Sequence, residues 1–259
     1  MDVEIDLNTT KNEIAYKVYN SFVRRYPFPH CEINNFLPDE LVELILKNWP
    51  NSTEFKTNLE SGSVVGDVKD TNHPYNFRYQ ICLTNVDEMG QIENNKRVIW
   101  EKLTSLICSS EVVQAFVTLY ANTLMRRFKF NTPSDLFSKI NYSPKIDLLH
   151  DKTNYSLGPH TDNPGKVIVF LVYFESDLEN DASNSYGTSV YVPRQKGFTC
   201  SKGIHYPHGD FIKVCSANFH KNNAFSFCRT DTSFHGVEKV ESKAVERKLL
   251  QVSIYGEPK

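Results

Sequence analysis

The sequence feature that most constrains the fold is a change in hydrophobic spacing near Pro144. Before this residue apolar side chains recur mainly at helical spacing, whereas after it short apolar runs alternate with turn residues. Eight strands are predicted, at 145–150, 155–162, 166–175, 187–193, 210–216, 223–228, 233–240 and 247–255. Eight short strands within about 110 residues are typical of a double-sheet jelly roll or barrel.

The N-terminal half is predicted to be mainly helical. Apolar spacing indicates an amphipathic helix at 12–25, and Pro38 followed by two acidic residues favours a helix that ends at Pro50. Two further helices are predicted within 92–125, interrupted at 109–111, whereas 51–80 is predicted to be mostly loop. The expected fold is therefore α+β with a mainly β, cupin-like jelly-roll core and N-terminal helices packed on its outside. We expect 1–259 to form a single domain, helical over about 1–140, with the jelly roll over about 141–256.

Charge and cysteine content restrict the classes of partner and the compartment. The chain has 29 basic and 31 acidic residues, so no excess of positive charge favours a nucleic-acid partner. Neither a signal peptide nor a run of about 20 apolar residues is present, so we expect no membrane segment and a cytoplasmic location. The six cysteines form no CxxC pair, which predicts reduced thiols inside a cell.

A histidine and an aspartate two residues apart are the first candidate metal ligands. His160 and Asp162 lie in the predicted strand 155–162, where alternate side chains share a face and could bind one ion together. A second such triplet is His208-Gly209-Asp210. Only 25 residues separate it from His235, whereas 73 residues and four predicted strands separate Asp162 from His235. Because the longer path suits a pocket at the mouth of a jelly roll, we assign 208–210 to a loop.

His235 is the predicted third ligand. Two imidazoles and one carboxylate form the facial arrangement that suits non-heme Fe(II) and leaves positions for a bidentate cosubstrate and oxygen. The absence of a thiolate argues against a structural zinc site, but the three ligands are equally compatible with a catalytic zinc. His30 and His73 are predicted to be packing or surface histidines.

Arg247 follows His235 by twelve residues and favours iron over zinc. If 233–240 and 247–255 pair as adjacent antiparallel strands through the turn ESKA, Arg247 lies about 10 Å along the sheet from His235. An arginine at that distance could bind the far carboxylate of a five-carbon diacid whose keto-acid end chelates the iron.

These residues resemble the HxD…H…R pattern of the Fe(II)- and 2-oxoglutarate-dependent oxygenases. The flanking segments LGPHTDNPGKVIVFLVYF, GTSVYVP, NNAFSFCRTDTSFHGVEKV and RKLLQVSIYG are similar in order and spacing to that superfamily's double-stranded β-helix. The stretch PFPHCEINNFLPDELVELILKNWP resembles the N-terminal segment of its bacterial and phage members, so the resemblance covers about residues 26–256.

The resemblance implies that His160, Asp162 and His235 bind Fe(II) and that Arg247 binds the distal carboxylate of 2-oxoglutarate, with Tyr155 as a second cosubstrate contact. Because Asp162 is present where the halogenating branch has a small residue, the implied reaction is hydroxylation, or a related oxidation of a C–H bond, that consumes O2 and releases succinate and CO2. Candidate substrate contacts flank the metal-bearing strands: Asn163, Lys166, Thr188 and Arg229.

The expected substrate is a small molecule, that is, a metabolite, an amino acid or a saccharide. Two other functions are compatible with the same residues. One is a cupin-like metalloenzyme that uses the three ligands without 2-oxoglutarate. The other is a jelly-roll module that binds carbohydrate or protein and whose histidines are structural.

Overall fold

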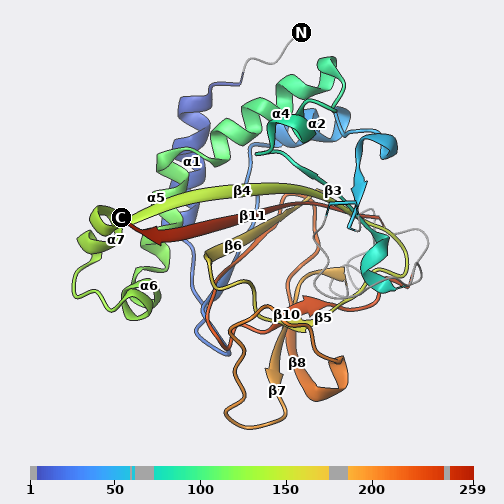
Figure 1. The fold of residues 1–259 in the computed structure, drawn as a ribbon. Coiled ribbons are helices and arrows are strands. Elements are labelled where there is room, and N and C mark those ends of the chain that lie inside the picture. Colours follow the sequence, from blue (N-terminus) through green and yellow to red (C-terminus); the bar gives the residue numbers. More distant parts are fainter. Residues whose placement is uncertain (1–4, 59, 62–72, 175–185, 242–245) are drawn as a thin grey trace.

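Two antiparallel sheets pack face to face in the computed structural model, which describes residues 5–58, 60–61, 73–174, 186–241 and 246–259. In these residues the large sheet has seven strands, in the spatial order β1 (His30–Ile33), β9 (Ala224–Cys228), β6 (Lys166–Tyr173), β11 (Arg247–Pro258), β4 (Ile140–Asp151), β3 (Arg78–Cys82) and β2 (Lys56–Thr57). The small sheet has the order β5 (Leu157–His160), β10 (His235–Val237), β7 (Ser189–Pro193) and β8 (Phe211–Ser216). Figure 1 shows the small sheet beneath the large one.

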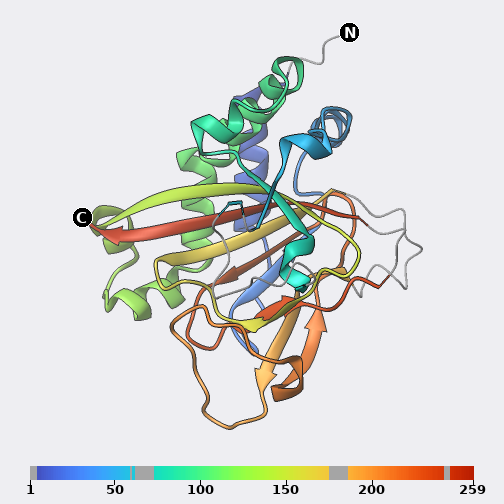
Figure 2. The same ribbon diagram turned by 45° about the vertical axis from the view of Figure 1, so that its right-hand side comes forward.

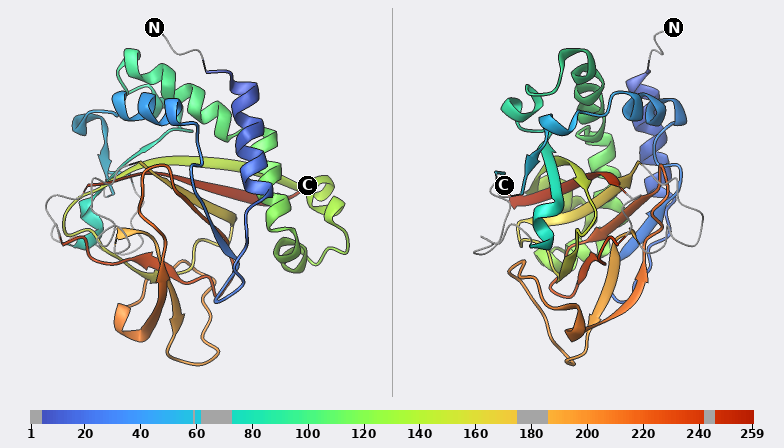
Figure 3. Two further views of the ribbon diagram at one scale, coloured as in Figure 1. Left: turned by 180° about the vertical axis from the view of Figure 1, so that it is seen from behind. Right: turned by 90° about the vertical axis from the view of Figure 1, so that its right-hand side faces the viewer.

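Helices cover the outer face of the large sheet, opposite the small sheet (Figures 1 and 2). They are α1 (Leu7–Tyr19), α2 (Asp39–Lys47), α3 (Val86–Met89), α4 (Asn94–Ile107), α5 (Ser110–Leu119), α6 (Ala121–Phe128) and α7 (Pro133–Lys139). The views from behind and from the side show the same layers, with α6 and α7 at the end of the sheet where the chain terminates (Figure 3). No helix in the described ranges is both long enough and apolar enough to span a bilayer.

Helix boundaries follow local capping chemistry. The Asp6 side chain accepts a hydrogen bond from the backbone N–H of Asn8 at the start of α1, and Ser109 does the same for Val112 at the start of α5. Pro133 occupies the first turn of α7, where its missing N–H costs little. The Ser109 cap separates α4 from α5 and confirms the interruption predicted at 109–111.

The large sheet separates two apolar clusters because its side chains alternate between faces. Outward residues such as Leu148, Phe170 and Leu250 pack with Trp100 and Phe116 of the helices. Inward residues pack toward the small sheet, and these include Leu149, Val169, Leu171, Leu249 and Phe227. The inner face becomes polar at several positions of β4 and β11, and these positions line the cavity described below.

The eight predicted strands are all present, which confirms the mainly β core with external helices. Their pairing differs from prediction in one respect. The strands at 233–240 and 247–255 are not neighbours, because β10 pairs with β5 and β7 whereas β11 pairs with β4 and β6. Burial on both faces draws β11 to the centre of the large sheet. The connecting residues 242–245 lie outside the described part of the chain.

Several N-terminal boundaries were predicted incorrectly. The first helix begins at Leu7 and ends at Tyr19, and Phe22 beyond it is 81 % exposed. The segment 92–125 contains a third helix, α6, which starts after Tyr120. Residues 51–80 were expected to be mostly loop, yet they contribute β2 and β3, which extend the large sheet beyond β4. Positions 59 and 62–72 of that segment, and 176–185 of the predicted polar loop, are not among the described residues.

Candidate active site

His160, Asp162 and His235 converge at one end of the space between the sheets. One potential ligand atom from each lies within 4.8 Å of the other two, and all three residues are buried. In the described residues this is the one group of three or more histidine, cysteine or acidic side chains close enough to bind a metal ion. The structure therefore brings together the three residues that the sequence predicted.

Direct pairing of β5 with β10 brings the two histidines together. His235 lies opposite His160 in the register, so their rings share a face, with 4.3 Å between ring centroids. Gly236 permits this close approach, since a Cβ built there would lie 2.4 Å from the carbonyl oxygen of Leu157. Asp162 lies two residues beyond the end of β5, and not within it as predicted.

Backbone carbonyls fix the orientation of both imidazoles. Nδ1 of His160 lies 3.0 Å from the carbonyl oxygen of Gly158, and Nδ1 of His235 lies 3.0 Å from that of Ser233. A carbonyl can only accept, so each Nδ1 carries the proton and donates it, and each Nε2 keeps its lone pair. This tautomer is the one needed when Nε2 binds a metal.

The charge states also match a metal-binding site. Burial lowers the pKa of His160 well below its ordinary value, with His235 and His205 adding to the effect, and burial likewise lowers the pKa of His235. Burial alone raises the pKa of Asp162, but Lys166 and the two ligand histidines outweigh it and lower that pKa overall. Two neutral imidazoles and one carboxylate result, as binding of a divalent cation requires.

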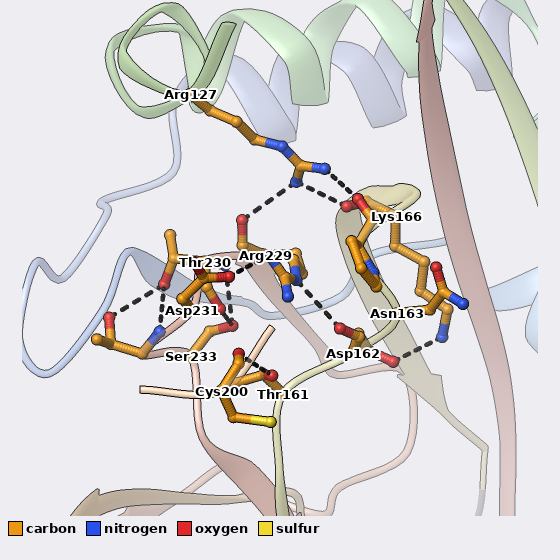
Figure 4. Close-up of polar contacts among 12 residues, drawn as sticks. Arg127, Thr161, Asp162, Asn163, Lys166, Cys200, Arg229, Thr230, Asp231 and Ser233 are labelled. Atoms are coloured by element: carbon orange, nitrogen blue, oxygen red, sulfur yellow. Dashed lines mark hydrogen bonds and ion pairs between the residues drawn. The ribbon is translucent and has the colours of Figure 1, made fainter. Parts of the chain in front are cut away.

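Asp162 is held by two cations from different directions (Figure 4). Nζ of Lys166 lies 2.6 Å from Oδ1 of Asp162, and Nε of Arg229 donates to its backbone oxygen over 3.1 Å. Oδ2 has no hydrogen-bond partner and lies 3.4 Å from Nε2 of His235. This buried, unpartnered oxygen is the atom available to a metal ion, while Oδ1 is occupied by Lys166.

A cavity of about 540 Å³ contains the triad and extends along the inner face of the large sheet. Arg247, the predicted cosubstrate residue, lines this cavity and is fully buried. It forms an ion pair with Asp151 through Nη1 and donates from Nε to the carbonyl oxygen of Tyr186 over 2.5 Å. Its Nη2 has no partner.

Asp151 belongs to a row of three charged residues across adjacent strands. The register places Arg247 of β11 and Arg78 of β3 on either side of it. Arg78 donates to Asp151 from Nε over 2.6 Å and from Nη2 over 2.9 Å, and its guanidinium lies 4.4 Å from the ring centroid of Tyr155. Two guanidiniums and one carboxylate leave a net charge of +1 in a buried row.

Tyr155 completes this end of the cavity. It precedes β5 and is not on that strand as predicted, but it is fully buried and lines the same cavity as Arg247. Its hydroxyl has no hydrogen-bond partner. An unpartnered hydroxyl, an unpartnered guanidinium nitrogen and one excess positive charge fit a carboxylate group, because buried polar atoms require partners.

Three residues at the site had not been predicted from sequence. Arg78 and Asp151 were missed because their role depends on strand pairing between segments more than 70 residues apart. His205 was missed because it stands in a loop without a ligand-like spacing. Its ring centroid lies 4.4 Å from that of His160 and 4.8 Å from that of Tyr75, and burial lowers its pKa to about 4.

The candidate substrate contacts divide into two groups. Asn163, Lys166 and Thr188 line the cavity, whereas Arg229 lies on the other side of the Asp162 loop. Thr188 is 2 % exposed and its hydroxyl is 2.9 Å from that of Tyr173.

The other histidines singled out in the sequence lie outside the triad. His208 begins a short 3-10 helix, η3 (His208–Asp210), and its ring centroid is 5.8 Å from that of Tyr191. His30 is buried, with Nδ1 bonded to the Phe28 carbonyl, and His73 packs on Tyr75. The packing roles predicted for His30 and His73 are confirmed, as is the exclusion of 208–210. All six cysteines are free thiols.

The fold and site together define a double-stranded β-helix with two histidines and one aspartate at the mouth of the roll. No family model and no curated protein matches the sequence. Among solved structures, the prolyl hydroxylase of Trichoplax adhaerens in complex with a hypoxia-inducible-factor peptide is similar with a TM-score of 0.54 and 13 % identity, over 98 % of this chain and 94 % of that chain. The epimerase SnoN, in complex with Fe3+, α-ketoglutarate and nogalamycin RO, is similar with a TM-score of 0.50 and 10 % identity, over 96 % and 86 % of the two chains.

A 2OG-Fe(II) oxygenase-family oxidoreductase from Burkholderia pseudomallei also matches, with a TM-score of 0.48 and 11 % identity over 95 % of this chain and 89 % of that chain. The chain therefore has the fold of the Fe(II)- and 2-oxoglutarate-dependent oxygenases, as the sequence resemblance implied. Its buried triad fits the HxD…H motif.

Proposed function

We propose that this protein is an Fe(II)- and 2-oxoglutarate-dependent dioxygenase that hydroxylates, or otherwise oxidises, a C–H bond of a small polar molecule. The observation that carries the proposal is the placement of two unsatisfied groups in one cavity. At one part of the cavity are three buried metal ligands, and at another are the unpartnered Nη2 of Arg247 and hydroxyl of Tyr155.

His160 and His235 would bind iron through Nε2, and Asp162 through Oδ2. The backbone carbonyls that accept from each Nδ1 hold the rings in place, and Lys166 holds the carboxylate by its other oxygen. Such supporting contacts commonly contribute 10- to 100-fold to metal affinity. When bound, iron and 2-oxoglutarate supply oxygen activation coupled to decarboxylation, with release of succinate and CO2.

Arg247 and Tyr155 would bind the distal carboxylate of 2-oxoglutarate. The row formed by Arg78, Asp151 and Arg247 carries a net charge of +1, which the distal carboxylate would neutralise. Because Asp151 already anchors one nitrogen of Arg247, the guanidinium is held in position before the cosubstrate arrives. Full burial of Arg247 removes competing water, which strengthens a charged hydrogen bond there.

A polar patch on the floor of the cavity supports a small, polar substrate. Lys145, Asp147, Gln251 and Ser253 of β4 and β11 line the cavity. Asp147 is 5 % exposed and forms an ion pair with Lys145, and the hydroxyl of Ser253 is buried without a partner. Such a surface favours a molecule with hydroxyl, amine or carboxylate groups, such as a saccharide or an amino acid, over a hydrocarbon.

The test is formation of succinate from 2-oxoglutarate by purified protein supplied with Fe(II) and oxygen. A panel of sugars, amino acids and short peptides is added separately, and oxidised product is sought by mass spectrometry. We expect iron-dependent succinate formation that at least one polar small molecule stimulates. Stimulation by peptides alone would instead place this chain's substrate nearer to that of the Trichoplax prolyl hydroxylase, which was solved with a peptide.

The same assay separates the two alternative functions. A cupin-like metalloenzyme would bind a divalent metal through the triad but would not consume 2-oxoglutarate. A jelly-roll binding module with structural histidines would retain no stoichiometric metal even after anaerobic reconstitution. Either result would refute the proposed reaction.

A further inference from the structure

A second cavity lies behind the loop that carries Asp162. It has a volume of about 910 Å³ and is bounded by residues of the 21–29 segment, by the end of α5 and residues of α6, and by residues 229–232. It shares no lining residue with the cavity that contains the triad. The loop from Asp162 to Lys166 therefore has a cavity on each side.

Positive charge is concentrated around this second cavity. Its described lining includes four arginines and a single carboxylate, that of Asp231. Arg25 and Arg126 are exposed at the rim, and neither forms an ion pair with a described residue. Three of the four guanidiniums consequently have no carboxylate partner among the residues that the structure describes.

Arg229 is the buried member of the group. It is 5 % exposed, its Nε donates to the backbone oxygen of Asp162 and its Nη1 lies 2.6 Å from Oδ1 of Asp231. Its Nη2 is buried and has no hydrogen-bond partner in the described structure. A buried charged donor without a partner is uncommon, because leaving one unpaired is costly.

Arg127 adds a second cation that carbonyl groups alone satisfy. It donates to the backbone oxygens of Lys166, Arg229 and Pro164 (Figure 4). Burial and the nearby Arg229 lower its pKa, yet a guanidinium keeps its charge at any ordinary pH. The two arginines therefore repel one another, and an anion between the rim and Arg229 would relieve that repulsion.

We propose that this second cavity binds a phosphate group, either free or as the monoester of a small molecule. A dianion matches the several unneutralised guanidiniums better than a single carboxylate does, and arginine forms paired hydrogen bonds with phosphate oxygens. The hydroxyls of Thr230 and Thr232 line the same wall and provide neutral donors. The volume leaves room for an organic group attached to the phosphate.

The proposal is independent of the oxygenase reaction, although Arg229 connects the two sites through Asp162. Binding can therefore be measured without iron or 2-oxoglutarate. Isothermal titration calorimetry of the whole protein, in a phosphate-free buffer at constant ionic strength, would use inorganic phosphate and glucose 6-phosphate as separate probes. Similar affinities would identify free phosphate as sufficient, and tighter binding of the ester would indicate a phosphorylated molecule.

The double variant Arg25→Gln/Arg126→Gln removes two exposed side chains, so the fold should persist, and each single variant is measured as well. We expect the double variant to weaken phosphate binding at least tenfold, which corresponds to about 1.4 kcal/mol. The matched control is Arg97→Gln on α4, an arginine that does not line the cavity. The proposal is overturned if neither probe binds more tightly than about 10 mM, or if the control weakens binding as much as the double variant.

Discussion

Substitution of Gly236 by alanine tests how the metal ligands are brought together. A Cβ at this position would lie 2.4 Å from the carbonyl oxygen of Leu157 and 3.2 Å from that of Gly158. Since real Cβ atoms essentially never approach closer than 3.0 Å, β10 and β5 must separate by at least about 0.6 Å. His235 and His160 lie directly opposite in those two strands, so the displacement acts on the distance between the two imidazoles.

Metal coordination tolerates displacements of only about 0.2 Å without loss of bond strength. We therefore expect Gly236→Ala to lower Fe(II) affinity by about 10- to 100-fold, the range seen when supporting contacts of metal ligands are removed. Affinity is measured anaerobically by competition with a metal-binding dye. The control is Gly209→Ala, because a Cβ at Gly209 meets no atom within 4 Å. Equal iron affinity in the two variants would refute the reasoning.

Three further predictions address charge. Asp151→Asn leaves two buried guanidiniums without their carboxylate and should cost about 3–5 kcal/mol, lowering Tm by about 6–10 °C, whereas Asp231→Asn, whose side chain is 52 % exposed, should lower Tm by 2 °C at most. Arg247→Ala should raise the KM for 2-oxoglutarate at least tenfold while iron affinity stays within twofold; unchanged kinetics would exclude Arg247 from cosubstrate binding. Burial lowers the pKa of His30 and His235, so the unfolded chain takes up more protons below pH 6.5 and Tm should fall from pH 7.5 to 5.5 in metal-free protein; a Tm that rises over that interval contradicts this.

Local patterns in the sequence identified the strands and the metal ligands correctly. The period-2 runs after Pro144 contain every strand of the small sheet, because each strand alternates between core and surface or is buried as a continuous apolar run. His160 and Asp162 were recognisable because two residues of extended chain place both side chains on one face. His235 was recognisable by its strand position after the longer path.

Partners that depend on tertiary pairing were not predictable in this way. Arg247 was identified by resemblance and spacing, but the geometric argument for it was wrong, because β11 pairs with β4 and not with β10. Its anchoring by Asp151 requires the register between β11 and β4, which no local pattern encodes. Arg78 likewise lies in a segment expected to be loop, and only its pairing with β4 brings it to the site.

His205 illustrates a different limit. It lies in a connection between β7 and β8 whose conformation is determined by packing of Tyr206 and Phe198 against Phe234. A loop histidine acquires meaning only when the path of the loop is known, and here that path brings the ring against His160.

The most direct test of the central claim is an anaerobic titration of the purified protein with Fe(II) and 2-oxoglutarate, followed by the visible charge-transfer absorption of the chelated keto acid. The account predicts one Fe(II) per chain, one 2-oxoglutarate bound only when iron is present, and loss of both in His235→Ala. Stoichiometric iron without any binding of 2-oxoglutarate, or iron binding that survives His235→Ala, would contradict it.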